Sequence, residues 1–179
     1  NTTVDICDTY DLLIQAYDAG CNNVVMEISS HSAAMGRVET LNFDYAIFTN
    51  LTQDHLDYHK TMGNYALAKQ KVFKHLKNTG IAIINGDDKY KEYFLLKENH
   101  NVTYGFEADE FKVENYTMNS EETMFSYSYQ GKTYHTVIKL LGKYNLYNCL
   151  AVIALLTCLG LKAEQIQKIL PTLKSPVGR

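Results

Sequence analysis

The chain has 179 residues, of which 46% are hydrophobic and 21% are charged, and its net charge is −3. These values are close to those of folded globular proteins, so they exclude disorder, a coiled coil and a disulfide scaffold as the main state. The net charge gives no sign of the basic surface that binds nucleic acid. The longest apolar run (149–159) is too short to cross a bilayer, and no signal peptide is expected. We therefore expect a cytosolic protein whose four cysteines are reduced and buried: Cys7, Cys21, Cys149 and Cys158.

The first hundred residues alternate between predicted helices and short apolar strands. Helices are expected at 5–19, 61–76 and 88–99, and strands at 24–28, 45–49 and 81–84. The helix at 5–19 should bury one apolar face, formed by Ile6, Leu12, Leu13, Ala16 and Tyr17. Strands that alternate with helices predict an α/β fold with a mostly parallel, doubly wound sheet flanked by helices.

The pattern changes near residue 101, from which point the apolar residues alternate with period two. Segments 102–106, 111–117, 123–129 and 133–140 predict a small antiparallel β meander over 101–141. Gly131-Lys132-Thr133 resembles the end of a phosphate-binding P-loop, but Ser126 stands where that motif needs glycine, so we interpret it as a turn. Two helices, at 146–159 and 163–173, close the chain, and the first should be mostly buried. We thus divide one domain, 1–179, into an α/β part (1–100), the meander and C-terminal helices (142–179).

Two predicted strand ends carry polar residues, and ligands bind beyond the carboxyl ends of strands in parallel sheets. Glu27 lies within the apolar strand 24–28, where a carboxylate is costly unless it is paired or binds a cation; a solvated strand end is the alternative. Residues 54–59 place two carboxylates and two histidines in six positions, and a polar loop that caps the next helix is the alternative. Lys69 lies on the apolar stripe of the helix at 61–76, where it is either paired or extends its ammonium to solvent.

The histidines also suggest a metal-dependent hydrolase. His55 and His59 have the spacing of the zinc-binding HExxH motif, but Leu56 follows the first histidine, so the general-base glutamate is missing. A hydrolase that uses Asp54, His55, Asp57 and His59 requires all four side chains to face one metal. A non-catalytic binding domain is the other alternative.

Several longer motifs resemble the central ATPase domain of the Mur ligases, most closely that of the E-type branch. They are MEISSH at 26–31, Arg37, FDYAIFTNLTQDHLDYHKTM at 43–62, YALAK ending at Lys69, INGDD at 84–88 and GKYNLYN at 142–148. Asn1-Thr2-Thr3 and the terminal PVGR at 176–179 fit the same order, so the resemblance covers essentially the whole chain. Lys60 departs from the family, which commonly has glycine there, and Met35 replaces a glutamine that contacts substrate in some members.

The resemblance implies an amide-bond-forming ligase of peptidoglycan precursor synthesis. The family uses ATP to phosphorylate UDP-MurNAc-L-Ala-D-Glu, and a diamino acid, L-lysine or meso-diaminopimelate, attacks the acyl phosphate. The family's P-loop, its uridine-nucleotide domain and its amino-acid-selecting domain have no counterpart in this sequence. We therefore expect a monomeric, cytoplasmic full-length enzyme without nucleic-acid or membrane partners, and an inactive isolated fragment.

The same resemblance assigns the site residues. Glu27, His55 and Lys69 match the catalytic and Mg²⁺-binding positions, and the family's matching lysine carries a carbamate derived from CO₂, whereas His59 should lie elsewhere. The matches to substrate-binding positions are Asn1, Thr2, Thr3, Ser29 and Arg37. The matches to ATP-binding positions are Asn145, Asn148 and Arg179, although capping of a helix would explain one of the two asparagines.

Overall fold

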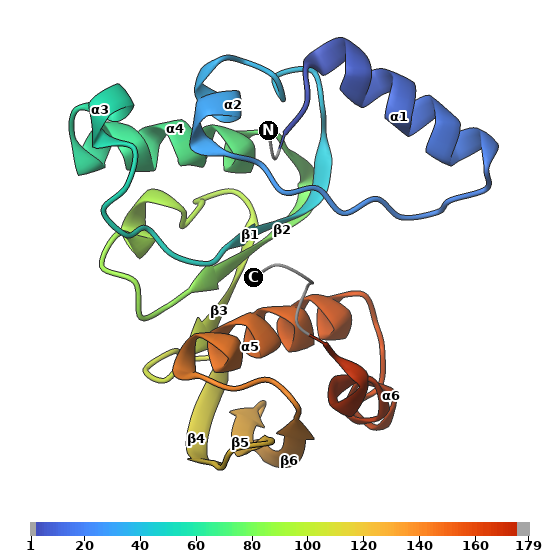
Figure 1. Ribbon diagram of the computed structural model, residues 1–179, viewed down its shortest axis with the longest axis vertical. Coiled ribbons are helices and arrows are strands. Elements are labelled where there is room, and N and C mark those ends of the chain that lie inside the picture. The colour runs from blue at the N-terminus through green and yellow to red at the C-terminus, as the bar shows by residue number, and fades with distance from the viewer. Residues whose placement is uncertain (1–2, 175–179) are drawn as a thin grey trace. The chain divides into compact units, whose positions relative to one another are not determined.

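The computed structural model describes residues 3–174, and the chain forms two compact units that it enters more than once (Figure 1). The first unit takes the residues up to Phe43 together with Thr52–Lys77. The second takes Asp44–Leu51 and the residues from Asn78 onward. Asn1, Thr2 and Arg179 of the predicted site lie outside the described residues, as does the PVGR motif.

The first unit is helical, and its helices are α1 (Ile6–Asp18), α2 (Ser30–Ala34), α3 (Leu56–His59) and α4 (Met62–Lys74). Side chains fix where the two long helices begin, because Asp5 accepts a hydrogen bond from the Cys7 N–H and Thr61 accepts one from the Asn64 N–H. The bounds predicted for these two helices are thus close to those observed. A small apolar cluster forms the core of the unit: Ala33, Val38 and Leu41, with Leu13, Met26, Ile28, Phe43 and Val72 packed against it.

The strand predicted at 24–28 is wrong, because this segment pairs with no strand in the described part of the chain. A buried parallel strand needs a hydrogen-bonded neighbour and cover on both faces. Met26 and Ile28 do pack against the apolar cluster, but the Val25 side chain between them is 91% exposed. The apolar run therefore places two partly buried side chains, Met26 and Ile28, in a segment that forms no strand.

Two burial predictions are also wrong in this unit. On α1, Leu12 and Tyr17 are exposed, and Thr9 is the helix residue that is buried, so the expected apolar face is largely uncovered. Cys7 and Cys21 are exposed, whereas Cys149 of the second unit is buried as expected. Cys7 lies in the first turn of α1 and Cys21 follows the helix, whose one buried residue is Thr9.

A six-stranded sheet dominates the second unit, with its strands in chain order. The strands are β1 (Phe43–Phe48), β2 (Leu76–Asn85), β3 (His100–Gly105), β4 (Phe111–Met118), β5 (Thr123–Tyr129) and β6 (Lys132–Ile138). The pairs β2–β3 and β3–β4 are parallel, and β4–β5 and β5–β6 are antiparallel. The predicted α/β class with an attached meander is therefore confirmed, except that the first predicted meander strand, β3, belongs to the parallel part.

The helix predicted at 88–99 is wrong, since only a 3₁₀ turn at Lys91–Tyr93 forms there. The Asp88 carboxylate accepts hydrogen bonds from the N–H groups of Tyr90 and Leu51, each at 2.8 Å. The Asn101 side chain bonds both the N–H and the C=O of Leu96. Such side-chain bonds compete with the hydrogen bonds of a helix, so the segment stays irregular.

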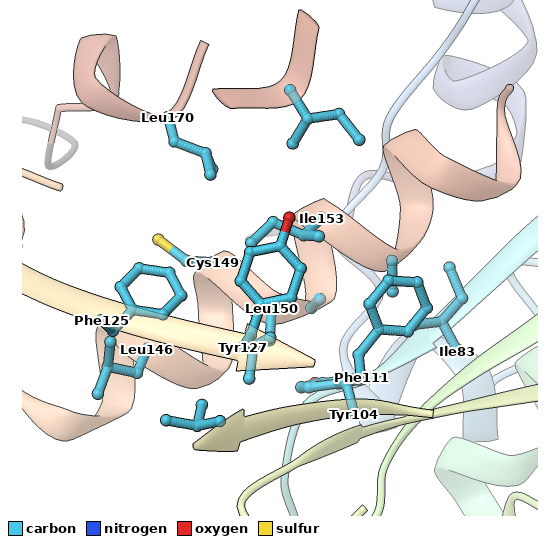
Figure 2. Close-up of a cluster of buried hydrophobic side chains, with 14 of the residues drawn as sticks. Ile83, Tyr104, Phe111, Phe125, Tyr127, Leu146, Cys149, Leu150, Ile153 and Leu170 are labelled. Atoms are coloured by element: carbon cyan, nitrogen blue, oxygen red, sulfur yellow. The ribbon is translucent and has the colours of Figure 1, made fainter. Parts of the chain in front are cut away.

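The core of the second unit lies between the sheet and α5 (Lys143–Cys158) (Figure 2). Leu146, Leu150 and Ile153 of α5 are fully buried and belong to one cluster with Tyr104 and Phe125 from the strands. The prediction that this helix is mostly buried is confirmed. It is followed by α6 (Ala163–Ile169) and a 3₁₀ turn at Leu170–Thr172.

A turn connects β5 to β6 at the predicted place, but it is shorter than expected, because Lys132 and Thr133 already belong to β6. Its residues, Gln130 and Gly131, have φ of 48° and 72°, which are the left-handed values that a tight hairpin requires. Among the described residues, no helix is long and apolar enough to cross a membrane.

Candidate active site

Thr3 connects three of the predicted site residues in the first unit. Its buried hydroxyl donates a hydrogen bond to the backbone C=O of Glu27 (3.0 Å) and accepts one from the backbone N–H of Ser29 (3.1 Å). Its own C=O accepts a hydrogen bond from Nη1 of Arg37 (3.0 Å). Thr3, Glu27, Ser29 and Arg37 therefore lie together, although they are spread over 35 positions of the sequence.

Ser29 also begins α2, because its Oγ accepts a hydrogen bond from the Ser32 N–H at 3.2 Å. The segment before it, which forms no helix or strand, holds Glu27 with an exposed side chain. The exposure of Glu27 is compatible with binding of a ligand at this position.

His55 is held by its backbone conformation rather than by burial. Its φ of 53° is left-handed, and its N–H donates to the Asp54 carboxylate at 2.8 Å. The imidazole Nε2 lies 3.5 Å from the other Asp54 oxygen, and the side chain is 43% exposed. The ring is also edge-on to His31, with centroids 4.8 Å apart. The His55 ring is thus accessible at the start of α3.

His59, one turn later, is buried and differently engaged. Its Nε2 lies 2.9 Å from Oγ of Ser30, and its ring stacks on Tyr65 with a centroid distance of 5.0 Å and an angle of 12°. Burial lowers the pKa of His59, and the nearby His31 and His55 lower it further, whereas Asp57 raises it. The ring is therefore neutral at neutral pH and occupied by structural contacts.

Tyr65 lies beside both His55 and Lys69. The Lys69 Nζ, one helical turn further along α4, is 5.4 Å from the centre of the Tyr65 ring, and the His55 ring is edge-on to it at 6.1 Å. Burial raises the pKa of Tyr65, with the charge of Asp54 acting in the same direction and a hydrogen bond with Ser30 acting against it. Lys69 itself is half-buried, between the two alternatives that the sequence left open.

These contacts link the segments that carry Glu27, His55 and Lys69 through Ser30, His59 and Tyr65. The convergence of the three candidate ligands on one cation stays a prediction. The contacts of Ser30, Tyr65 and His31 could not be predicted from the sequence. The four-residue spacing between Tyr65 and Lys69 predicts that they share one face of a helix. Tyr65 by itself, however, has the character of an ordinary core residue.

The contacts of the DHLDYH segment do not support a four-ligand hydrolase centre. The His59 Nε2 faces Ser30, and the Asp54 carboxylate binds the His55 backbone. Within residues 3–174, no group of three or more His, Cys, Asp and Glu side chains is arranged to hold a metal ion. Mg²⁺ usually binds one or two carboxylates together with waters and substrate phosphates, so an exposed Glu27 fits Mg²⁺ better than it fits an all-protein metal centre.

The predicted ATP-binding asparagines lie in the second unit, in the first turns of α5. The Asn145 Nδ2 donates to the Leu141 C=O at 2.7 Å, and the Asn148 Nδ2 is 3.4 Å from Oδ1 of Asn145. Gly142 occupies the N-cap position, so neither asparagine caps the helix. Asn148 is exposed, and Asn145 is half-buried.

A carboxylate beside this helix has three hydrogen-bond donors. Asp87 accepts from the Phe106 N–H (2.7 Å), the Glu107 N–H (2.9 Å) and the Tyr147 hydroxyl (2.7 Å). Burial raises the pKa of Tyr147, and its hydrogen bond to Asp87 raises it further. A Cβ on Gly105 would lie 2.6 Å from the same carboxylate, which explains why this position has no side chain.

The mixed sheet and the site residues of the first unit fit one class of protein, and the chain belongs to the Mur ligase middle-domain family, whose model matches residues 1–156. It is similar to the UDP-N-acetylmuramoyl-L-alanyl-D-glutamate–2,6-diaminopimelate ligase of Fusobacterium nucleatum, with 38% identity over the whole chain and 37% of that protein. A ligase of the same name, numbered 1, from Clostridium acetobutylicum is 45% identical over 87% of the chain and 32% of its own length.

Solved structures agree with this assignment. A structure of a UDP-N-acetylmuramoyl-L-alanyl-D-glutamate–2,6-diaminopimelate ligase superposes with a TM-score of 0.89 and 25% identity, over 99% of this chain and 38% of that one. A MurF ligase from Thermotoga maritima in complex with ADP shares the fold, with a TM-score of 0.72 and 18% identity over 85% of this chain and 35% of its own. The chain thus spans between 32% and 38% of the length of these relatives.

Proposed function

We propose that this chain is the central part of an ATP-dependent ligase that adds a diamino acid to UDP-MurNAc-L-Ala-D-Glu in the cytoplasm. The observation that carries the proposal is the 38% identity, along the entire chain, to a ligase whose name specifies this substrate. The relatives' names specify 2,6-diaminopimelate, which favours this diamino acid over L-lysine.

The reaction has two steps. The free carboxylate of D-Glu attacks the γ-phosphorus of ATP, which forms an acyl phosphate and releases ADP. The amine of the diamino acid then attacks the acyl carbon, so that an amide forms and inorganic phosphate and a proton leave. Phosphoryl transfer relies mainly on positioned charges, because the negative charge is spread over the oxygens of the transferred group.

We assign the acceptor substrate to the Thr3 region of the first unit, where Asn1, Thr2, Thr3, Ser29 and Arg37 would bind it. The guanidinium of Arg37 is half-buried, and one of its nitrogens is fixed by the Thr3 C=O. Its remaining N–H groups suit a carboxylate or phosphate of the substrate. We assign ATP to Asn145, Asn148 and Arg179, where the amides would recognise the base by hydrogen bonds.

Glu27, His55 and Lys69 would hold Mg²⁺, which offsets the negative charge of the phosphates when it is bound. An unmodified lysine ammonium does not suit a cation site. A carbamate does, since the neutral Lys69 amine adds CO₂ to form an N–C bond and loses one proton, which replaces a positive group with a negative one. Glu27 is accessible for the same task, and the His55 ring is partly exposed.

The proposal is tested by Lys69→Ala in the full-length ligase, with Lys74→Ala as the matched control because Lys74 is an exposed lysine on the same helix. We expect Lys69→Ala to lower the rate of amide formation at least a hundredfold, which is the typical loss for a charged group that stabilises the transition state. Binding of ATP should remain within a few-fold of wild type, and a short carboxylic acid in the buffer should restore part of the rate. Normal turnover of Lys69→Ala contradicts the proposed role of Lys69.

A further inference from the structure

Three buried side chains, none of which the proposed chemistry uses, connect the segments that carry Glu27, His55 and Lys69. They are Ser30 on α2, His59 on α3 and Tyr65 on α4, and each is at least 94% buried. We refer to Ser30, His59 and Tyr65 as the buried anchor.

The contacts within the buried anchor are specific. The Ser30 hydroxyl and the His59 Nε2 are 2.9 Å apart, and this hydrogen bond is shielded from water. The His59 ring lies nearly parallel to the Tyr65 ring at 5.0 Å. Removing one partner of a buried hydrogen bond leaves the other unsatisfied, so the contact fixes where α2 and α3 meet.

Each residue of the anchor lies close in the chain to one candidate ligand. Ser30 follows Glu27 by three positions, and Tyr65 precedes Lys69 by one helical turn. The His59 N–H donates to the His55 C=O at 2.9 Å, so that these two histidines share one helical turn. A shift in the position of any anchor residue therefore also shifts the candidate cation-binding residue that lies next to it in the chain.

We infer that Ser30, His59 and Tyr65 are positioning residues that hold Glu27, His55 and Lys69 in the arrangement that binds a divalent cation. The inference rests on the proposed function, because it takes these three side chains as the cation's ligands. Groups that orient metal ligands without touching the metal typically contribute 10- to 100-fold to metal affinity. The anchor fulfils this description without contributing a ligand of its own.

The test measures binding of Mn²⁺ to the full-length ligase by electron paramagnetic resonance, with Mn²⁺ as the probe for Mg²⁺. His59→Phe keeps an aromatic ring for stacking on Tyr65 and removes the hydrogen bond to Ser30. We expect it to weaken Mn²⁺ binding about tenfold and to raise the Mg²⁺ concentration for half-maximal rate by a similar factor. The KM for ATP at saturating Mg²⁺ should change less than threefold. His59→Gln, whose amide can reach Ser30, should recover most of the affinity.

Two further variants make the outcome decisive. Leu41→Ala removes a buried side chain from the apolar cluster of the same unit, so it should lower the melting temperature but leave Mn²⁺ affinity within twofold. An equal loss of Mn²⁺ affinity in Leu41→Ala and His59→Phe would show general destabilisation and overturn the inference.

Glu27→Gln separates this inference from the proposed function. If Glu27→Gln weakens Mn²⁺ binding and His59→Phe does not, the anchor has no positioning role and only the inference fails. If Glu27→Gln leaves Mn²⁺ binding unchanged, the cation site itself is misassigned, and the role proposed for Glu27 fails together with the inference.

Discussion

Replacing Asp87 by asparagine should loosen the junction between β3 and α5. The carboxylate accepts three hydrogen bonds, two at one oxygen and one at the other. An asparagine keeps a single acceptor oxygen and turns its NH₂ group toward a donor. At least one charge-assisted hydrogen bond is therefore lost, and such a bond contributes about 1.5–3 kcal/mol to stability. The hydrogen bonds that remain are weaker, because their acceptor is no longer charged. We expect Asp87→Asn to lower the free energy of opening at this junction by about 2–3 kcal/mol.

Hydrogen exchange of the Phe106 and Glu107 amides measures this loss directly, because both amides donate to Asp87. A loss of about 2–3 kcal/mol corresponds to exchange that is roughly 30- to 150-fold faster. Tyr147→Phe removes only the hydroxyl donor and serves as the partial variant, with an expected loss of about 1–2 kcal/mol. Exchange of both amides within threefold of wild type in Asp87→Asn would refute the assignment of Asp87 as the acceptor that holds this junction.

Three other outcomes follow from the structure. Leu150→Ala, in the centre of the fully buried face of α5, should lower the free energy of unfolding by about 2–5 kcal/mol in urea denaturation, and a loss below about 1 kcal/mol would contradict the packing described. Burial raises the pKa of Tyr127 from 10.0 to about 12, so this tyrosine ionises at lower pH in the unfolded chain than in the folded one. The stability of the folded chain should therefore fall as the pH rises above 10. In Tyr127→Phe, the midpoint of urea unfolding should fall less steeply between pH 9 and 11. The isolated chain should release no phosphate from ATP with Mg²⁺ and UDP-MurNAc-L-Ala-D-Glu, because the resemblance places the P-loop outside it, and a rate within tenfold of the full-length ligase would contradict that.

Local patterns predicted the elements that their own residues specify. The segment 146–159 is strongly apolar, and most of its residues in α5 are buried or half-buried, as expected of such a sequence. The Gln130-Gly131 turn needs left-handed backbone, and glycine provides it. The predictions failed where distant residues decide. Segment 24–28 has the composition of a strand but no partner among the described strands, and the helix expected at 88–99 is displaced by hydrogen bonds of Asp88 and Asn101.

The candidate site also combines features that could be predicted from the sequence with features that could not. The resemblance identified Thr3, Ser29 and Arg37 as neighbours of one substrate, and the hydrogen bonds of Thr3 bring them together. The buried anchor was not predicted, because Ser30 and His59 are 29 positions apart and each residue alone resembles a common core or loop residue. They meet because α2 and α3 both pack against α4.

The order in which the chain visits its two units constrains its synthesis. The chain changes unit at 43/44, 51/52 and 77/78, so that β1 reaches the ribosome exit long before β2, its neighbour in the sheet. The remaining part of the first unit, Thr52–Lys77, emerges between β1 and most of β2. A nascent chain that pauses near residue 77 therefore carries a complete helical unit while Ala46 and Phe48, buried in the finished sheet, still face solvent. An unpaired apolar strand of this kind is a binding site for chaperones and a starting point for aggregation, so translation speed through 52–77 should affect the yield of folded protein.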